Sequence, residues 1–490
     1  MSVKWSKYQK KIFNTVYDTD TSIVIDAVAG SGKSTTLFHV ASILQEYDSL
    51  FLAFNVHISK WAENKLGKNP NMRVQTSHSY GLSCIKNSEY KNSIFNIGKV
   101  WSAVEANTKN YKIRGRLYSV ISVLRDFGCF SYTTKDLMDY VRNVPTVLTQ
   151  INDAGIFSYA GEICTIMKKL DEDTTCYDFN DMMRMPIIHN LMDNGYKPEV
   201  LLVDECQDLS YYQFMFIKNI LKNGARVIAV GDDKQGIYGF RGADGDALNV
   251  VQSLCKAKRL PLSISYRCKS NIVDYVIDRF EKSNDDDLPI EANADGGKVV
   301  EAAGRKEDPY ALKLLVDNDI TFVVSPKNKH IIFIWFTLLE EYGLPSSLKG
   351  TKITNMLTKI FKDLKSNGVV YANAEKSLRL KMASEDETEA DNAASAYRFL
   401  TMQRKIRDYD SLLKLITSLD KDTKSKIHLH TVHSAKGLEA EKVFLVDDFF
   451  ASDQKANMEY VACTRASDLL IIVTPFKDKT EQSYASYQAK

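Results

Sequence analysis

The sequence predicts an α/β protein with two cores, each a parallel sheet flanked by helices, and with helical insertions in both. First, the β-branched run Ile23–Ile25 leads into a turn of small residues and then a helix. Second, the predicted strands Val200–Val203 and Arg226–Val230 are each followed by polar side chains, as parallel strands are where their carboxyl ends form a site. Third, the apolar runs Ile320–Val324 and Leu469–Val473 predict a second core.

Length and composition indicate a soluble chain of several domains. The 490 residues correspond to about three domains. Hydrophobic residues make up 44%, and no apolar run approaches the ~18 residues of a membrane span, so we expect neither a membrane segment nor secretion. The eight cysteines are scattered and include no Cys-x-x-Cys pair, which argues against a zinc or iron–sulfur site held by closely spaced cysteines. Their spacing favours reduced thiols in a cytoplasm, either bacterial or that of a virus's host. With a net charge of only +2, nucleic-acid binding would need a local basic surface.

The first core is organised around the turn Ala27–Thr35, which matches the pattern G-x-x-x-x-G-K-[ST] except for alanine at the first glycine. Small residues let successive backbone N–H groups close around phosphate oxygens at the start of a helix. Lys33 is expected to reach the β- and γ-phosphates of ATP, and the Ser34 hydroxyl to bind Mg²⁺. A chance Gly/Ser turn is the alternative for this motif alone. The residues expected to hold the nucleotide here are Ala29, Gly30, Ser31, Gly32, Lys33, Ser34 and Thr35.

Carboxylates at the end of another strand complete the predicted hydrolytic site. Asp204 and Glu205 follow Val200–Val203, and a nucleotide hydrolase needs one carboxylate for Mg²⁺ and another to take a proton from water. Because adjacent strand residues point to opposite faces, we assign Asp204 to the metal and Glu205 to the water. A strand-end cap is the alternative for an isolated Asp–Glu pair. Gln9, on a preceding helix, has the donor and acceptor to pair with an adenine edge, or it is an exposed helix residue.

Two further groups of residues suit a triphosphate and a polynucleotide. The Gln235 amide is expected to sense the γ-phosphate, and Tyr238 and Phe240 follow it as rings that grip bases, unless this loop packs into the core. Arg267 and Arg465 belong to the second core, and guanidinium groups supplied across a cleft stabilise the charge that develops in phosphoryl transfer. If both reach the γ-phosphate, hydrolysis requires the cores to close. The alternative is that they are ordinary surface arginines.

The segment Thr431–Glu439 is rich in hydroxyl groups. Its early residues suit the phosphates of a strand, and Glu439 is expected to accept a hydrogen bond from a ribose hydroxyl. A Ser–His nucleophile is rejected because the serine does not sit on a nucleophile elbow. Within the helical stretch 86–175, the run Lys109–Arg116 places four cations around Tyr111, which suits single-stranded nucleic acid and an ordinary solvated turn equally well.

With these blocks in this order, the chain resembles superfamily 1A helicases of the UvrD/Rep/PcrA type. The blocks run from near the start of the chain to near its end, and alanine at the first glycine of the phosphate-binding turn is usual in that family. The matching residues are Gln9, 27–35, 53–55, 76–79, Asp178 and Phe179, 204–208, 231–244, Tyr266 and Arg267, 431–439, 460–462 and 464–466.

The resemblance implies two RecA-like P-loop NTPase cores, 1A and 2A, with ATP and Mg²⁺ between them and single-stranded DNA across them. It implies that Tyr266 stacks on adenine. The strand contacts that it implies are Phe54, Asn55, His78, Tyr238, Phe240, Arg241, Thr431 and His433. It divides the chain into core 1A (1–85 and 176–255), helical insert 1B (86–175), core 2A (256–350 and 426–490) and a small 2B-like insert (351–425). This 2B-like insert is shorter than the large 2B domain that the family usually has.

We therefore expect an ATP-dependent single-stranded DNA translocase and helicase, moving 3′ to 5′ as the resemblance implies. Its expected partners are single-stranded DNA and junctions of single and double strands, without a membrane, and it is expected to act as a monomer. One alternative is a DNA-stimulated ATPase that strips or remodels protein–DNA complexes, which the reduced 2B region favours. Another is a nucleotide-switched binding module, which the paired carboxylates and arginines argue against. RNA stays open because stacking and phosphate contacts barely distinguish the sugar. Repair, recombination and replication stay open as pathways.

Overall fold

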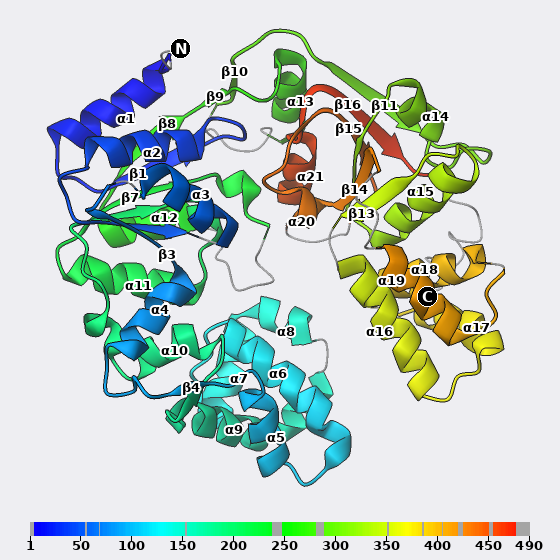
Figure 1. Ribbon diagram of the computed structural model, residues 1–490, viewed down its shortest axis with the longest axis horizontal. Coiled ribbons are helices and arrows are strands. Elements are labelled where there is room, and N and C mark those ends of the chain that lie inside the picture. The colour runs from blue at the N-terminus through cyan, green and yellow to red at the C-terminus, as the bar shows by residue number, and fades with distance from the viewer. Residues whose placement is uncertain are drawn as a thin grey trace. The chain divides into compact units, whose positions relative to one another are not determined.

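The computed structural model describes residues 4–53, 56–67, 69–151, 154–237, 247–280, 289–349, 352–384, 387–403, 405–419, 425–449 and 454–476. The chain divides into two compact units, Met1–Ser263 and Ile264–Lys490, and each is described by itself. Each unit contains a six-stranded parallel sheet flanked by helices, which confirms the predicted α/β class with two cores (Figure 1). Among the described residues, no helix has both the length and the apolar character needed to pass through a membrane.

The sheet of the first unit has the strand order β3-β2-β6-β7-β1-β8, with every pair parallel. Its strands are β1 (Ile23–Ala27), β2 (Ser49–Ala53), β3 (Met72–Thr76), β6 (Val200–Val203), β7 (Arg226–Gly231) and β8 (Lys258–Leu262). Side chains alternate between two core clusters, with Ile23 and Ile25 in one and Val24 in the other. Helices cover both faces, which requires apolar side chains on both. These helices are α1 (Lys7–Asp18), α2 (Lys33–Ile43), α3 (Val56–Leu66), α4 (Ser77–Lys86), α10 (Asp181–Ile188), α11 (Tyr211–Lys222) and α12 (Ala247–Cys255).

Strand β8 pairs with β1 along its whole length, with Leu260 opposite Ile25. The boundary predicted at residue 256 assigns this segment to the second core, whereas the pairing places it in the first sheet. It lies at the edge of that sheet, where Pro261 is tolerated because an edge strand leaves one side of its backbone unpaired. The remainder of the division into cores and inserts stays a prediction.

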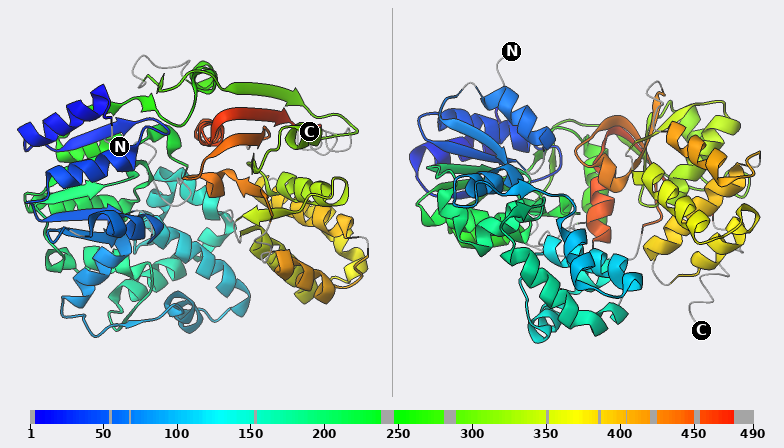
Figure 2. Two further views of the ribbon diagram at one scale, coloured as in Figure 1. Left: turned by 45° about the horizontal axis from the view of Figure 1, so that its top comes forward. Right: turned by 60° about the horizontal axis from the view of Figure 1, so that its bottom comes forward.

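Helices that follow β3 and α4 form an insert with a hydrophobic core of its own. Val104, Leu117 and Ile163, from three different helices, are fully buried in that core. The short strands β4 (Ile94–Phe95) and β5 (Cys176–Tyr177) pair where the chain enters and leaves the insert. Figure 2 shows the insert helices gathered together, coloured from light blue to teal. They are α5 (Lys99–Asn107), α6 (Arg114–Asp126), α7 (Thr134–Asn143), α8 (Pro145–Ile151) and α9 (Ala160–Glu172).

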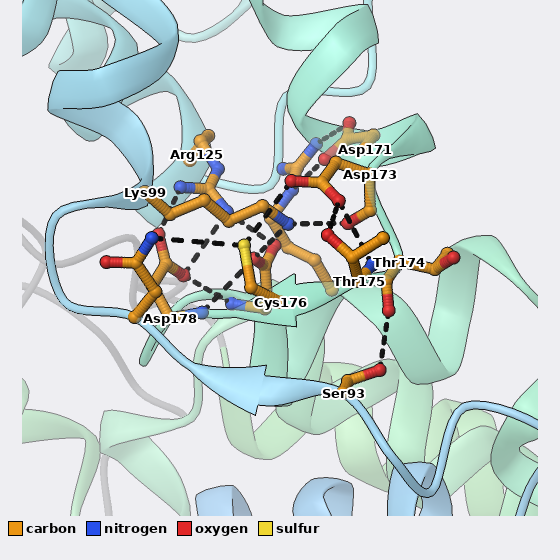
Figure 3. A network of polar contacts seen from close by, with 12 residues as sticks. Ser93, Lys99, Arg125, Asp171, Asp173, Thr174, Thr175, Cys176 and Asp178 are labelled. Atoms are coloured by element: carbon orange, nitrogen blue, oxygen red, sulfur yellow. Dashed lines mark hydrogen bonds and ion pairs between the residues drawn. The ribbon is translucent and has the colours of Figure 1, made fainter.

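A buried network of charges joins this insert to helix α10 of the first core (Figure 3). Arg125 of α6 donates from Nη1 to Asp178 Oδ2 at 2.6 Å and from Nη2 to Asp181 Oδ1 at 2.5 Å. Lys99 of α5 donates to Asp181 Oδ2 at 2.7 Å, and Arg184 of α10 forms an ion pair with Asp171 of α9 at 2.5 Å. Burial raises the pKa of Asp181, although Arg125 and Lys99 oppose that shift. The insert is therefore attached to the core through charges that have lost most of their contact with water.

The sheet of the second unit has the strand order β11-β16-β15-β12-β14-β13, again with every pair parallel. Its strands are β11 (Lys298–Ala303), β12 (Phe322–Ser325), β13 (Ser346–Lys349), β14 (Ile427–Thr431), β15 (Ala440–Val446) and β16 (Ala466–Thr474). A separate short pair consists of β9 (Ile264–Ser265) and β10 (Glu291–Ala292). The accompanying helices are α13 (Ser270–Phe280), α14 (Leu312–Asp317), α15 (Asn328–Glu340), α20 (Val432–Ala435) and α21 (Lys455–Cys463).

Four more helices occupy the region predicted as a small 2B-like insert. They are α16 (Lys352–Ser366), α17 (Ala374–Lys381), α18 (Glu387–Met402) and α19 (Tyr409–Leu419). Phe361 of α16 and Phe399 of α18 belong to the same core cluster as Val323 of the sheet. Trp335 of α15 stacks on Phe399 with 6.4 Å between ring centroids. These helices therefore share one continuous core with the second sheet.

Candidate functional site

The predicted phosphate-binding turn lies between the end of β1 and the start of α2. Gly30 and Gly32 have φ values of 72° and 78°, which a glycine adopts without strain. Ser31 is fully buried, and its Oγ has no hydrogen-bond partner among the described residues. The turn thus combines a helix N-terminus, where backbone N–H groups lack partners within the helix, with an unpaired buried hydroxyl, an arrangement that suits phosphate oxygens.

Lys33 and Gln235, predicted from separate segments, meet at Asp232. The Lys33 Nζ lies 4.0 Å from Asp232 Oδ2, and the Lys33 side chain is 9% exposed. Gln235 donates from Nε2 to the same Asp232 oxygen at 2.5 Å. Burial raises the pKa of Asp232, and Lys33 lowers it. The Asp232 carboxylate at the end of β7 therefore contacts both residues that were predicted to bind phosphate.

The two predicted metal ligands are in direct contact. Ser34 Oγ donates to Asp204 Oδ2 at 2.7 Å, which joins the start of α2 to the end of β6. Asp204 is 2% exposed, and burial, followed by the charge of Glu205, raises its pKa to about 7. The described residues contain no group of three or more His, Cys, Asp or Glu side chains able to hold a metal. Mg²⁺ fits this pair because it is commonly held by one or two carboxylates together with substrate phosphates and water.

Glu205, the predicted base, has a left-handed backbone with φ of 52°. This conformation is uncommon for a residue with a side chain and marks a turn directly after the strand. Its Oε2 accepts a hydrogen bond from Gln207 Nε2 at 2.6 Å, while Gln207 Oε1 accepts from the Asp232 backbone N–H at 3.0 Å. Gln207 therefore connects the predicted base with the residue that contacts Lys33.

Gln9 lies against the phosphate-binding turn, as its predicted role requires. Its Oε1 accepts from the Ser6 backbone N–H at 3.0 Å in a capping box, and its Nε2 donates to Thr36 Oγ1 at 3.1 Å. The side chain is 4% exposed, so it is not the exposed helix residue of the alternative. Pairing with adenine would require the amide to exchange these partners, and that role stays a prediction.

The residues of the second unit that were predicted to bind the nucleotide form hydrogen bonds with each other and with backbone carbonyls. Arg267 donates from Nε to Glu439 Oε2 at 2.7 Å and from Nη1 to the Thr464 carbonyl at 3.1 Å. Arg465 is 1% exposed, and its guanidinium donates to the carbonyls of Val461 at 2.8 Å and Leu438 at 2.9 Å. Arg465 is therefore not the surface arginine of the alternative. Tyr266, the predicted adenine platform, is 43% exposed.

The predicted strand contacts fall into two groups. His78 is exposed on the first turn of α4, and Thr431 caps α20, on which His433 is partly exposed. Thr431 Oγ1 accepts from the Ser434 backbone N–H at 3.2 Å, which fixes the start of that short helix. Five other predicted contacts lie outside the described residues, namely Phe54, Asn55, Tyr238, Phe240 and Arg241.

Sequence reasoning assigned no role to Asp232, Gln207 or Phe179. Asp232 and Gln207 each follow a strand with polar residues at its end and lie within the matching blocks 231–244 and 204–208, and these were the available signals for them. Phe179, just before α10, is 56% exposed and meets Phe95 edge-on with 5.0 Å between ring centroids. The sequence does not reveal this exposure or the contact with Phe95.

Comparison with known proteins gives two family matches, one in the first unit and one in the second. A model of the UvrD/REP helicase N-terminal domain matches residues 5–256, and a model of the UvrD-like helicase C-terminal domain matches residues 426–473. The first match spans every strand of the first sheet except β8, together with the insert. The second covers β14, β15, α21 and most of β16.

Individual relatives are distant. F-box DNA helicase protein 1 of Schizosaccharomyces pombe is 22% identical, over 95% of this chain and 57% of that protein. ATP-dependent DNA helicase PcrA of Staphylococcus epidermidis is 23% identical, over 82% of this chain and 59% of that protein. Gabija protein GajB of Bacillus cereus is 24% identical, over 56% of this chain and 63% of that protein. The chain therefore spans less than two thirds of each of these relatives.

Proposed function

Because the chain belongs to the UvrD/REP helicase family, we propose that it is an ATP- and Mg²⁺-dependent motor that moves along single-stranded DNA and separates duplex. The observation that carries this proposal is the contact between Ser34 Oγ and Asp204 Oδ2 at 2.7 Å, one residue from the buried Lys33. A hydroxyl, a carboxylate and an ammonium group drawn from two strand ends are the set that a Mg²⁺–triphosphate requires.

Each residue of the first unit has a distinct task in this proposal. Backbone N–H groups of the turn and Lys33 bind the phosphates, while Ser34 and Asp204 hold the metal. Bound Mg²⁺ would neutralise charge on the phosphate oxygens. Glu205 takes a proton from the attacking water, and its hydrogen bond with Gln207 orients the carboxylate. Gln235 senses the γ-phosphate through its amide.

The second unit supplies positive charge in the transition state. Arg267 and Arg465 stabilise the equatorial oxygens of the transferred phosphoryl group, so turnover requires both cores. Arg267 must leave Glu439 to do so, which frees that carboxylate for the ribose hydroxyl. Tyr266 stacks on the adenine. This exchange of partners couples nucleotide binding to closure of the cores.

The single strand is held by stacking and by contacts with its phosphates, and closure changes that hold. His78, Thr431 and His433 contact the strand together with Phe54, Asn55, Tyr238, Phe240 and Arg241. Movement is 3′ to 5′, and RNA is the competing substrate because these contacts scarcely read the sugar. A second function, remodelling of protein–DNA complexes without unwinding, is favoured by the four helices α16–α19, which are packed into the second core and leave no large 2B domain in the described chain.

Tailed duplexes test the proposal most directly. We expect Mg²⁺-dependent ATP hydrolysis that single-stranded DNA stimulates, and unwinding of a forked duplex with a 3′ tail in preference to a 5′ tail. Matched RNA substrates test the choice of sugar, and Lys33→Ala is the inactive control. Stimulated hydrolysis without unwinding of either tail would select the remodelling function. Tight ATP binding without turnover would overturn both motor functions in favour of a nucleotide-switched module.

A further inference from the structure

We propose that the helical insert carries an auxiliary binding site for single-stranded nucleic acid, separate from the strand contacts of the two cores. The site, which we name the insert face, consists of Trp101 on α5, Tyr118 on α6, and Lys109, Tyr111 and Lys112 in the connection between them. This proposal depends on the proposed function in one respect, that the chain binds a single strand at all.

Exposed aromatic rings are the first observation that supports the insert face. Tyr111 is 72% exposed, Trp101 43% and Tyr118 39%. The rings of Trp101 and Tyr118 meet edge-on, with 5.8 Å between centroids, so they form one aromatic surface across α5 and α6. Aromatic rings bind unpaired bases by stacking, and this interaction tolerates any base sequence.

The connection holds Tyr111 in an outward position. The residues Tyr111–Ile113 form the short helix η1, and Asn110 Oδ1 accepts from the Lys112 backbone N–H at 3.1 Å at its start. Ile113 at the other end is 5% exposed and belongs to the core of the insert. With one end capped and the other buried, Tyr111 and Lys112 are presented to solvent by a fixed turn. A ring held in place loses less entropy when a base stacks on it.

The charge of this connection complements a polyanion. Residues 109–116 contain four cations and no acidic residue, in a chain whose net charge is only +2. Arg114 is paired with Glu105 at 3.0 Å and donates to the Thr108 carbonyl, so its charge is partly neutralised. Lys109 and Lys112 are both exposed on either side of Tyr111. They are positioned to bind the phosphates next to a base that stacks on the ring.

No side chain covers the start of α6 at Gly115. A Cβ atom built on Gly115, on the first turn of α6, would meet no atom within 4 Å. Tyr111 lies in η1, which leads into this helix, and Tyr118 lies on the helix itself, three residues after Gly115. Paired bases offer no free faces for stacking, which favours a single strand over a duplex. Exposed lysines are depleted from the centres of protein interfaces, which disfavours a protein partner.

An auxiliary site makes affinity depend on strand length. A short oligonucleotide would occupy the cores alone, whereas a longer one would reach the insert face as well. The second contact then forms within the same complex, at the effective concentration set by the intervening nucleotides. The insert face would therefore strengthen the hold on long strands and leave short ones unaffected.

Fluorescence anisotropy with labelled oligo(dT) of stepwise increasing length tests this site. Tyr111→Ala should weaken binding of long strands about fivefold or more and leave short strands unchanged. Lys109→Ala/Lys112→Ala should lower the salt slope for long strands by about 1.4, from about 0.7 per phosphate contact. Tyr111→Phe should retain binding, because the ring is kept. Matched controls on α1 are Tyr17→Ala, at a tyrosine 82% exposed, and Lys10→Ala/Lys11→Ala, none of which should matter.

The outcomes separate this site from the motor. Wild-type affinity that rises with length, with the rise lost in Tyr111→Ala, supports the insert face. Variants equal to wild type at every length would overturn it and leave the motor proposal intact. Equal losses at all lengths, or an equal loss on blunt duplex, would also overturn it. Absence of any binding by the wild-type chain to DNA or RNA would overturn both proposals.

Discussion

Arg267 and Glu439 hold each other in the second unit, with 2.7 Å between Nε and Oε2, although both are predicted to bind the nucleotide. The Glu439 side chain is 65% exposed, so the pair is accessible to solvent and easily exchanged. Arg267 also donates from Nη1 to the Thr464 carbonyl at 3.1 Å, so its guanidinium has two partners within the second unit.

Arg267→Ala is expected to slow ATP turnover while leaving the fold intact. If the guanidinium stabilises the transferring phosphoryl group, its removal should lower kcat by about 10³-fold or more. Steady-state ATPase kinetics with saturating DNA measure this. Arg279→Ala is the matched control, because Arg279 also forms ion pairs within the second unit, with Asp447 and Glu459 at 3.5 Å. A kcat within a few-fold of wild type in Arg267→Ala would contradict the assigned role.

Lys33→Ala and Glu205→Gln should fail at different steps. Loss of the buried ammonium beside the phosphate-binding turn should weaken ATP binding itself, whereas Glu205→Gln should bind ATP normally and lose turnover, since only proton transfer is removed. A fluorescent ATP analogue measures binding, and phosphate release measures turnover. Glu199→Gln, at an exposed glutamate of the same unit, controls for charge. Normal turnover in Glu205→Gln would show that another group is the base.

Arg125→Ala should destabilise the first unit strongly. The substitution leaves the carboxylates of Asp178 and Asp181 facing each other without their shared partner, and breaking a buried ion pair typically costs about 3–5 kcal/mol. Urea unfolding of purified protein measures the loss. Arg142→Ala breaks an exposed pair with Asp139 and should change the free energy of unfolding by less than about 1 kcal/mol. Equal effects of the two substitutions would mean that the buried network does not anchor the insert. If Arg125→Ala does not fold, Arg125→Lys can be measured in its place, because it keeps the positive charge and should lower the free energy of unfolding by less.

Asp391→Asn should stabilise the second unit in a pH-dependent way. Asp391 is 7% exposed, and one of its oxygens accepts from the Asn328 backbone N–H at 2.9 Å at the start of α15. Burial raises its pKa from 3.8 to about 6. The folded state therefore holds this proton more tightly than the unfolded chain, so wild-type stability falls as pH rises from about 4 to about 6 and is level above that.

The difference between variant and wild type isolates this group from all others that titrate. A shift of about two pKa units corresponds to about 3 kcal/mol, which is the largest gain expected for Asp391→Asn above pH 6. Below pH 4 the two proteins should be about equally stable. Urea midpoints measured across this range test it, and a difference that does not change with pH would contradict it.

The sequence was sufficient for contacts that depend on local spacing. Lys33 and Ser34 follow from the turn, because its length and small residues determine where the helix begins. Asp204 follows from its place at the end of an apolar strand. Ser34 and Asp204 were both predicted to bind one Mg²⁺, because parallel strands bring their carboxyl ends to one edge of the sheet, and the structure places them in contact.

Other features depend on which strands are neighbours. Asp232 reaches Lys33 because β7 pairs with β1, with Gly231 opposite Asp26, and strand order cannot be read from local sequence. The edge position of β8 escaped prediction for the same reason. The burial of Arg465 depends on the carbonyls of Leu438 and Val461, which are brought together only by tertiary packing.

The continuous core beneath α15 has a consequence for how this chain can be shortened. Deleting 351–425 would remove Phe399, on which Trp335 stacks, and would expose an apolar side of α15 to water, rather than remove a separate appendage. Any engineered minimal version should therefore retain these four helices, even if they never touch a substrate.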